Sequence, residues 1–367
     1  MPIYNGQLNT NEVVAPLFNQ IIAISTVSDN LKGVEGSLVE RAKTNGGLYG
    51  DTKLVRDTDI LKSYNWLNDA EASNLLKLYR PTRPKEQSFV VNKFRKIPVT
   101  IDHYMTKRAF MSEGSFSEFI SVVLGWIRGT KRLYDARIYN TYIGTARSEA
   151  KINTVEIPLT EITATGEEKN RLEAQMISQS IADLIAHLKN GSRNYNDYKF
   201  MRSYNEDDLV IVWNMAYVNK ITKIDLPTIF HKDGLFSFDN TLLPEFFGEV
   251  NAESGTTGSS NTTIYSMVEK DFNTVDMNDP DYNPELHIFP GDLYPSSTAY
   301  EANETYTVNS NKIAIVMHKD AVPFMSSFEV QNAFNNPASL TETHYLIYGY
   351  NTLEYAYGKP FIVIESK

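Results

Sequence analysis

The sequence predicts an α+β protein, because strand-type and helix-type patterns both fill long stretches of the chain. β-branched and aromatic residues alternate with polar ones in two early stretches, as in "SFVVNKFRKIPVTI". Two later stretches carry apolar residues at helical spacing, and three strand-type runs close the chain. The 367 residues are 42% hydrophobic and 22% charged, which is enough to bury a large core.

The first third of the chain predicts an extended arm followed by a protruding hairpin. Residues 1–47 have short apolar runs and little periodicity, which favours an arm with room for one short helix. Residues 51–66 and 86–101 are predicted to form two antiparallel strands. Between them the sequence predicts a helical turn and then a tip stiffened by Pro81 and Pro84.

A long helix is predicted next, over residues 115–142. Apolar residues recur there at helical spacing, and Ser115 with Glu118 has the spacing of a capping box. About 28 residues at about 1.5 Å per residue make a rod of roughly 40 Å, which can support a flat molecule.

A second helix is predicted over residues 167–188. Thr165 and Glu168 form a possible capping box at its start, and Asn190 with Gly191 marks its end. One of its faces is apolar, so this helix is expected to pack on a core.

The remainder alternates between strand-type and acidic stretches. The unbroken apolar run 209–213 predicts a central, buried strand. Residues 233–311 hold 14 Asp+Glu and a single Lys, which favours exposed loops or an insertion, above all at 255–310. Strand-type runs after residue 311 predict that the end of the chain returns to a sheet.

The charge is unevenly distributed along the chain. Residues 1–150 contain 20 Lys+Arg and 15 Asp+Glu, giving +5, whereas residues 151–367 contain 15 and 30, giving −15. Such a division fits a basic nucleic-acid module beside an acidic one, or copies of one chain that place basic parts on acidic neighbours. Composition alone leaves both open.

The strongest candidate for a binding surface is the basic, aromatic stretch 78–102. Clustered cations with interleaved rings are typical of single-strand nucleic-acid binding. The candidate interface residues are Arg80, Arg83, Lys85, Phe89, Lys93, Phe94, Arg95 and Lys96.

Catalytic and metal-binding patterns are weak in this sequence. The six histidines lack metal-ligand spacing, and the chain contains no cysteine. Asp276, Asp279 and Asp281 lack the glycine and the glutamate of an EF-hand loop. Phosphate-binding glycine loops and nucleophile elbows are missing as well. We therefore expect no enzyme activity, cofactor or metal. A metal-assisted hydrolase that uses the acidic loops is kept as a third hypothesis, after the two functions given at the end of this subsection.

Targeting signals are also missing. The N-terminus has no basic start or apolar block, and the longest apolar stretches are shorter than a membrane span. The expectation is a protein made in a cytoplasm, with no membrane partner.

Several stretches resemble the major capsid proteins of tailed bacteriophages with the Hong Kong 97 fold. The resemblance is carried by the run from "KEQSFVVNKFRKIPVTIDHYM" to "SFSEFISVVLGWIRGTKRLYDARIYNTYIGTAR", and by "MPIYNGQLNTNEVV", "GGLYGDTKLV", "DLVIVWNMAYVNKI", "LLPEFFGEVN" and "GYNTLEYAYGKPFIVIE". It spans most of the chain, and the acidic stretch 255–310 is the part least like that family.

The resemblance implies a definite domain organisation. It implies an N-terminal arm, an extended hairpin called the E-loop, a peripheral domain built on a spine helix, and an axial domain that points loops at a local five- or six-fold axis. The expected ranges are 1–47 for the arm, 48–104 for the E-loop, 105–165 with 334–367 for the peripheral domain, and 166–333 for the axial domain.

The resemblance also implies the function. Subunits of that family form pentamers and hexamers that close an icosahedral shell around double-stranded DNA. Expected partners are other copies of the chain, a separate scaffolding protein, a portal, and DNA held on the inner face without sequence specificity. The expected location is the virion, after assembly in the bacterial cytoplasm. A single-strand nucleic-acid binding protein that uses the hairpin 78–102 is the alternative.

Overall fold

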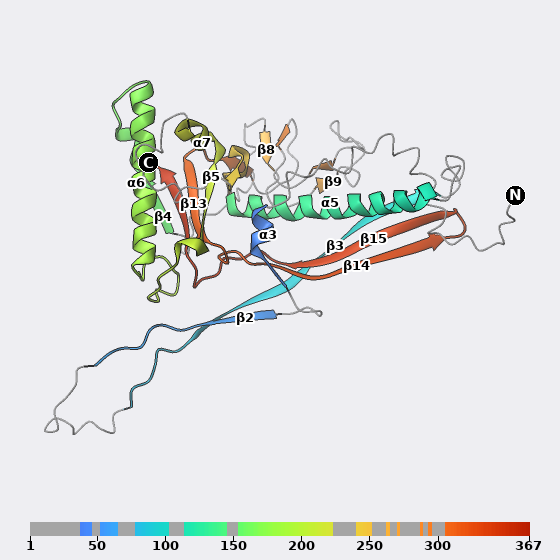
Figure 1. Cartoon of the computed structure of the whole chain (residues 1–367), viewed down its shortest axis with the longest axis horizontal. Helices are drawn as coiled ribbons and strands as arrows, with labels where there is room; N and C mark the ends of the chain where they lie inside the picture. The colour runs from blue at the N-terminus through green and yellow to red at the C-terminus, as the bar shows by residue number, and fades with distance from the viewer. Residues whose placement is uncertain are drawn as a thin grey trace.

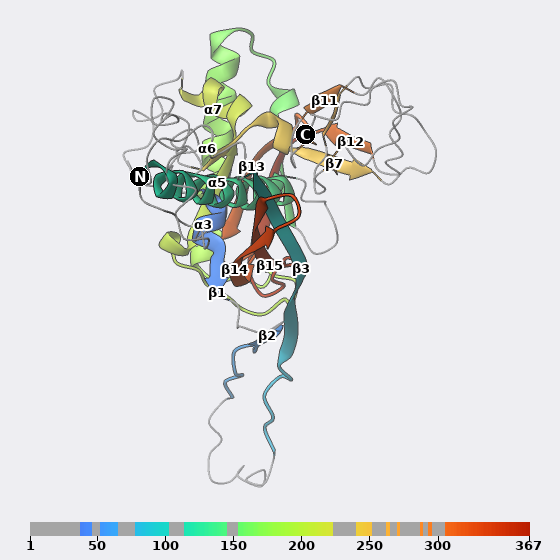
Figure 2. The same ribbon diagram turned by 90° about the vertical axis from the view of Figure 1, so that its right-hand side faces the viewer.

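A computed structural model of the chain shows two five-stranded sheets, two long helices and a projecting hairpin (Figure 1). The sheets and helices make up the body of the molecule, and the hairpin extends away from it (Figure 2). The structure describes residues 37–45, 52–64, 78–102, 114–144, 153–222, 240–251, 262–264, 270–271, 287–288, 293–295 and 305–367.

The first sheet is long and narrow. Its central strands β14 and β15 form an antiparallel hairpin, and β15 pairs with β3 from Thr341 opposite Asp102 to Asn351 opposite Val91. At one edge, β1 runs parallel to the start of β14. The strand order is β1 (Lys43–Asn45), β14 (Phe324–Asn336), β15 (Thr341–Asn351), β3 (Lys85–Asp102) and β2 (Thr52–Asp57).

Helix α5 (Gly114–Gly144) packs along one face of this sheet and confirms the predicted long helix (Figure 1). At 31 residues it is a rod of roughly 46 Å. Alternate residues of β15, such as Leu346 and Tyr348, pack in the same core as Ile127 and Tyr139 of the helix. The side chains of the predicted capping box lie outside the described residues.

The second sheet is the centre of the body. From Ala314 to Met317 the residues of β13 alternate between two cores, one shared with α5 and the other with α6 (Glu167–Lys189). All seven residues of β13 are buried. The predicted central strand is confirmed as β5. The strand order is β4 (Asn153–Ile157), β16 (Phe361–Ser366), β13 (Lys312–His318), β5 (Leu209–Asn214) and β6 (Thr241–Leu242).

Helix α6 confirms the second predicted helix but corrects its start. The N-cap is Gly166, with φ of 71°, and no side chain caps this end. Because the chain enters the helix through a left-handed conformation that favours glycine, Thr165 lies outside the helix and makes no capping box with Glu168. The predicted end is confirmed, since Asn190 is the C-cap and Gly191 has φ of 84°.

The smaller elements complete the body. Helix α3 (Leu38–Ala42) is a short helix near the end of the predicted arm, and α7 (Met215–Thr222) follows β5. Single 3-10 turns are η4 (Leu159–Glu161), η5 (Glu206–Asp208) and η7 (Pro244–Phe246).

The acidic stretch 233–311 is predicted as loop, and the structure corrects this in part. Short antiparallel pairs interrupt the stretch, because β7 pairs with β12, β8 with β11, and β9 with β10. Their bounds are β7 (Gly248–Asn251), β8 (Thr262–Ile264), β9 (Lys270–Asp271), β10 (His287–Ile288), β11 (Leu293–Pro295) and β12 (Thr305–Val308).

The predicted hairpin is confirmed at its base. Strands β2 and β3 pair antiparallel from Thr52 opposite Val90 to Asp57 opposite Lys85. Beyond this ladder, residues 58–64 and 78–84 continue without regular structure (Figure 2). The predicted helical turn falls on residues 65–77, outside the described residues.

The strands of the predicted domains share sheets. Strands β4 and β16 come from stretches expected in the peripheral domain, and they pair in the sheet that holds β5 and β13 from the expected axial stretch. Strand β14 spans the expected boundary at residues 333 and 334. The domain ranges themselves stay a prediction.

Candidate assembly surface

The predicted interface residues lie on the E-loop hairpin, which comprises β2, β3 and the residues between them. Arg80 and Arg83, near its far end, are exposed, and no hydrogen bond or ion pair joins them to other described residues. Lys93 and Lys96, further along β3, are exposed in the same way. These four cations can therefore meet a partner without breaking a contact to the described part of their own chain.

Two of the predicted cations already have aromatic partners. The Nζ atom of Lys85 lies 5.1 Å from the ring centre of Tyr198, a cation–π distance. The Nε atom of Arg95 donates a hydrogen bond of 3.1 Å to the Tyr350 hydroxyl. Both residues therefore help to hold β3 on the body.

The two phenylalanines of the prediction have different positions. Phe94 is 58% exposed on β3, so it can offer apolar surface to a neighbour. Phe89 is only 2% exposed and packs with Val91 and Met325 of its own chain. The prediction that Phe89 contacts a neighbour is therefore corrected, because the ring is already removed from water.

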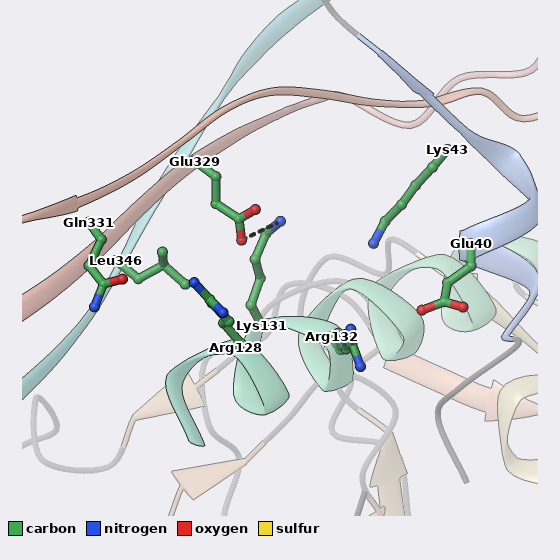
Figure 3. A pocket seen from close by; sticks show the side chains of 8 residues that line it. All are labelled: Glu40, Lys43, Arg128, Lys131, Arg132, Glu329, Gln331 and Leu346. Atoms are coloured by element: carbon green, nitrogen blue, oxygen red, sulfur yellow. Dashed lines mark ion pairs between the residues drawn. The ribbon is translucent and has the colours of Figure 1, made fainter. Parts of the chain in front are cut away.

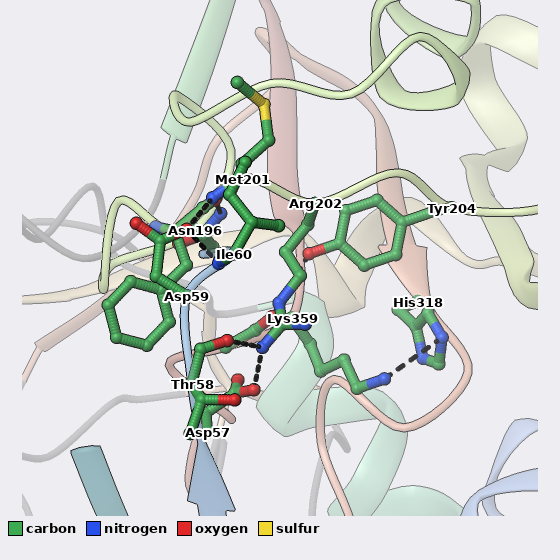
Figure 4. Close-up of polar contacts among 12 residues, drawn as sticks. Asp57, Thr58, Asp59, Ile60, Asn196, Met201, Arg202, Tyr204, His318 and Lys359 are labelled. Carbon is green, nitrogen blue, oxygen red and sulfur yellow. Dashed lines mark hydrogen bonds and ion pairs between the residues drawn. The ribbon is translucent and has the colours of Figure 1, made fainter. Parts of the chain in front are cut away.

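A polar cluster that sequence reasoning missed lies where the E-loop leaves the body (Figure 4). Asp57 pairs with Arg202, which also donates a hydrogen bond to the Thr58 carbonyl oxygen at 2.9 Å. Asp59 pairs with Arg193 at 2.7 Å. The two arginines are more than 130 residues away in sequence, in a loop with no local motif, so no sequence signal links them to the E-loop.

A second charged cluster lines a cavity of about 530 Å³ between α5 and the first sheet (Figure 3). Lys131 of α5 reaches Glu329 of β14 at 3.2 Å and Asp135 at 3.9 Å. Lys43, at the start of β1, reaches the same Asp135 carboxylate at 3.4 Å. The cluster therefore connects the end of the predicted arm to α5 and β14.

Burial and ion pairing act in opposite directions on Asp135. Its side chain is 2% exposed, and this burial raises the pKa of the carboxyl, while the ammonium groups of Lys131 and Lys43 oppose the rise. A buried carboxylate that lacked these two partners would be strongly destabilising. The cluster is thus an element of the fold.

The described residues offer little for catalysis. No three His, Cys, Asp or Glu side chains gather as metal ligands in this part of the chain. His318 is buried, which lowers the pKa of its imidazole to about 4. Its Nδ1 accepts a hydrogen bond from the Asp320 amide at 3.0 Å, so the ring serves a turn of the body. Asp276, Asp279 and Asp281 lie outside the described residues.

None of the helices in the described part of the chain is both long and apolar enough to cross a membrane.

The fold of the chain is similar to that of chains in two solved phage structures. It is similar to a chain in the capsid structure of Staphylococcus phage Andhra, at 13% identity over 89% of this chain and 83% of that one, with a TM-score of 0.61. It is also similar to a chain in the structure of the head fiber and inner core protein of native bacteriophage P68, at 13% identity over 100% and 88%, with a TM-score of 0.55. These likenesses agree with the Hong Kong 97-type fold.

The chain belongs to the Phi29-like phage major capsid protein family, whose sequence model matches residues 4–364. Comparison with curated proteins gave no match. The protein is therefore a structural subunit of a tailed-phage capsid, and the resemblance seen in the sequence is confirmed. The alternative of a single-strand nucleic-acid binding protein gains no support from these comparisons.

Proposed function

We propose that the chain forms pentamers and hexamers that close an icosahedral shell around the double-stranded DNA of a tailed phage. The observation that carries the proposal is the E-loop, which leaves the body with exposed cations and apolar side chains. Membership of the Phi29-like major capsid family supports the same conclusion. Hairpins that cannot bury their own apolar sides need neighbours, and identical copies supply them in a symmetric assembly.

The electrostatic part of the proposal concerns the tip of the E-loop. Arg80 and Arg83 lie in the part of the chain with a charge of +5, whereas residues 151–367 carry −15. In a shell of identical copies, each basic E-loop meets the acidic part of an adjacent copy. Opposite charges then guide the encounter and fix the orientation of the two subunits.

The remaining E-loop side chains extend this contact towards the base of the hairpin. Lys93 and Lys96 add positive charge along β3, and the exposed ring of Phe94 adds apolar area. Lys85 and Arg95 contribute positive charge from positions next to their aromatic partners.

The proposal includes partners beyond the shell itself. A separate scaffolding protein and a portal direct assembly in the cytoplasm of the host, and the completed shell holds DNA on its inner face without reading its sequence. Contacts of that kind are made to the phosphates of DNA, so their affinity depends on the salt concentration and not on the base sequence.

The test reverses the charge at the E-loop tip. We expect Arg80→Glu with Arg83→Glu to reduce strongly the yield of closed particles in electron microscopy, because the tip then repels acidic neighbours. The control pair Arg80→Lys with Arg83→Lys keeps the charge and is expected to assemble. Normal shells from the glutamate variant at both low and high salt would contradict the proposed interface.

A nucleic-acid assay distinguishes shell assembly from the alternative function, which is single-strand nucleic-acid binding by the hairpin 78–102. Filter binding with a salt titration measures whether the glutamate variant loses affinity for single strands. Loss of that affinity while shells still form would favour the nucleic-acid function for the hairpin.

A further inference from the structure

The first strand of the E-loop is held to the body by charged groups (Figure 4). At the end of β2, Asp57 pairs with Arg202, and two residues later Asp59 pairs with Arg193. The Oδ1 atom of Asp59 also accepts a hydrogen bond of 3.0 Å from the backbone amide of Met201. All three partners belong to the loop 192–202, which follows α6.

The second strand is held opposite the first by the Gln87 amide and by a cation–π contact of Lys85. Gln87 is 8% exposed, and its amide donates to the Tyr355 carbonyl oxygen at 2.7 Å and accepts from the Tyr357 amide at 2.9 Å. Lys85 lies over the ring of Tyr198, which belongs to the same loop that holds β2. Both strands are therefore tied to the body just before they diverge from it.

The loop 192–202, which holds the first strand, is joined to the segment 355–358, which holds the second. The Asp197 amide donates to the Tyr357 carbonyl oxygen at 2.9 Å, and the rings of Tyr198 and Tyr357 meet edge to face with centres 5.9 Å apart. Gly358 lies against the Asp57 carboxylate, so closely that a Cβ atom there would overlap it. The loop 192–202 and the segment 355–358 thus make one continuous support.

The Asp59 carboxylate stays ionised at neutral pH. The hydrogen bond from Arg193, together with that from the Met201 amide, lowers the pKa of Asp59 from 3.8 to about 2. The Asp59 side chain is 11% exposed, whereas that of Arg193 is 46% exposed. The carboxylate is thus fixed in the support, and the arginine reaches it from the surface.

We propose that Asp57 and Asp59, held by Arg202 and Arg193, form a clamp that fixes the direction of the E-loop in the single chain before any neighbour binds. This inference goes beyond the proposed shell function, because it concerns the isolated chain and holds whether or not a shell forms. The clamp is defined by these four side chains.

The clamp matters because a small rotation at the base of the E-loop produces a large displacement at its far end. The described segment 60–64 beyond the clamp spans at most roughly 18 Å, so a rotation of about 15° at its base moves the far end by about 5 Å. That displacement exceeds the length of an ion pair, so an unclamped E-loop would sample many positions that miss a given partner. A clamped E-loop presents its tip in one place and lowers the entropy lost on binding.

The test measures the direction of the E-loop directly. The chain contains no cysteine, so Thr82→Cys near the tip and Gln179→Cys on α6 accept spin labels at two chosen exposed sites. Pulsed electron paramagnetic resonance gives the distribution of distances between the two labels. An excess of unlabelled chain ensures that only distances within one subunit are measured. We expect one narrow distribution for the parent chain and one at least twice as broad after Asp57→Ala with Asp59→Ala.

Two further variants make the result specific. Glu86→Ala removes the 2.8 Å pair with Arg56, which lies within the hairpin, and should leave the distribution narrow. Asp59→Arg combined with Arg193→Asp restores one pair in the opposite sense and should narrow the distribution compared with Asp59→Arg alone. An unchanged distribution in the double alanine variant, with its fold verified by circular dichroism, would overturn the clamp.

Discussion

The second sheet and the E-loop hairpin are built in opposite ways. All seven residues of β13 are buried, whereas five of the six residues of β2 are exposed. The sheet receives cover from α5 and α6 of the same chain, whereas the contacts that hold the described part of the hairpin on the body lie along β3 and at residues 57–59. The difference indicates that the stability of the subunit comes from the body, and it agrees with the proposal that the E-loop presents surface to other copies.

The largest expected effect is in the body. Ile315 lies on β13 and is fully buried, so Ile315→Ala is expected to lower the free energy of unfolding by about 2–5 kcal/mol through lost burial and a cavity. Ile60 on the E-loop is 56% exposed, so Ile60→Ala should change it by less than about 0.5 kcal/mol. Denaturant unfolding of both variants measures the contrast, and equal losses would refute it.

A smaller effect is expected from the pH dependence of the body. The pKa of His318 is about 4 in the folded chain against an ordinary value of 6.5, because of burial and then the nearby Lys359 ammonium. Between these pH values the unfolded chain binds a proton that the folded chain does not, so stability falls as pH falls from 6.5 to 4.

The expected loss over that window is on the order of 1–3 kcal/mol. The matched variant is His318→Asn, whose side-chain oxygen can accept the Asp320 amide but does not titrate. Urea unfolding at several pH values should show a weaker pH dependence for the variant. Parallel curves for the two proteins would show that His318 contributes nothing to it.

The smallest expected effect on stability is at the tip of the E-loop. Arg80→Glu with Arg83→Glu should change the free energy of unfolding by less than about 0.5 kcal/mol, since both side chains are exposed and no hydrogen bond or ion pair joins them to the described part of their own chain. Thermal unfolding of unassembled subunits checks this. A large loss would mean that the tip supports the fold of its own subunit, and the contrast between the two regions would then disappear.

The sequence predicted the elements whose pattern is local. Helices α5 and α6 and the strands at the base of the E-loop were visible from periodicity, and the buried strand β5 from its unbroken apolar run. The start of α6 was misplaced because a left-handed glycine, a matter of backbone conformation, replaced the expected threonine cap. Short strands in the acidic stretch were missed because pairs of two to four residues leave almost no pattern.

The candidate surface was predictable only as a cluster of charges and rings. Burial of Phe89 depends on Met325, which lies far along the chain, whereas the sequence prediction rested on the place of Phe89 in the basic, aromatic stretch 78–102. The arginines that hold Asp57 and Asp59 are also distant from them in sequence. Contacts of this kind follow from the tertiary fold, and a single sequence does not reveal them.

The most direct test of the central claim is a cryo-electron microscopy map of the assembled particle that resolves the E-loop. We predict that Arg80 and Arg83 of each copy lie within ion-pair distance, about 4 Å, of carboxylates on an adjacent copy. E-loop tips that lie on packaged DNA, or that contact no neighbouring copy, would contradict the account.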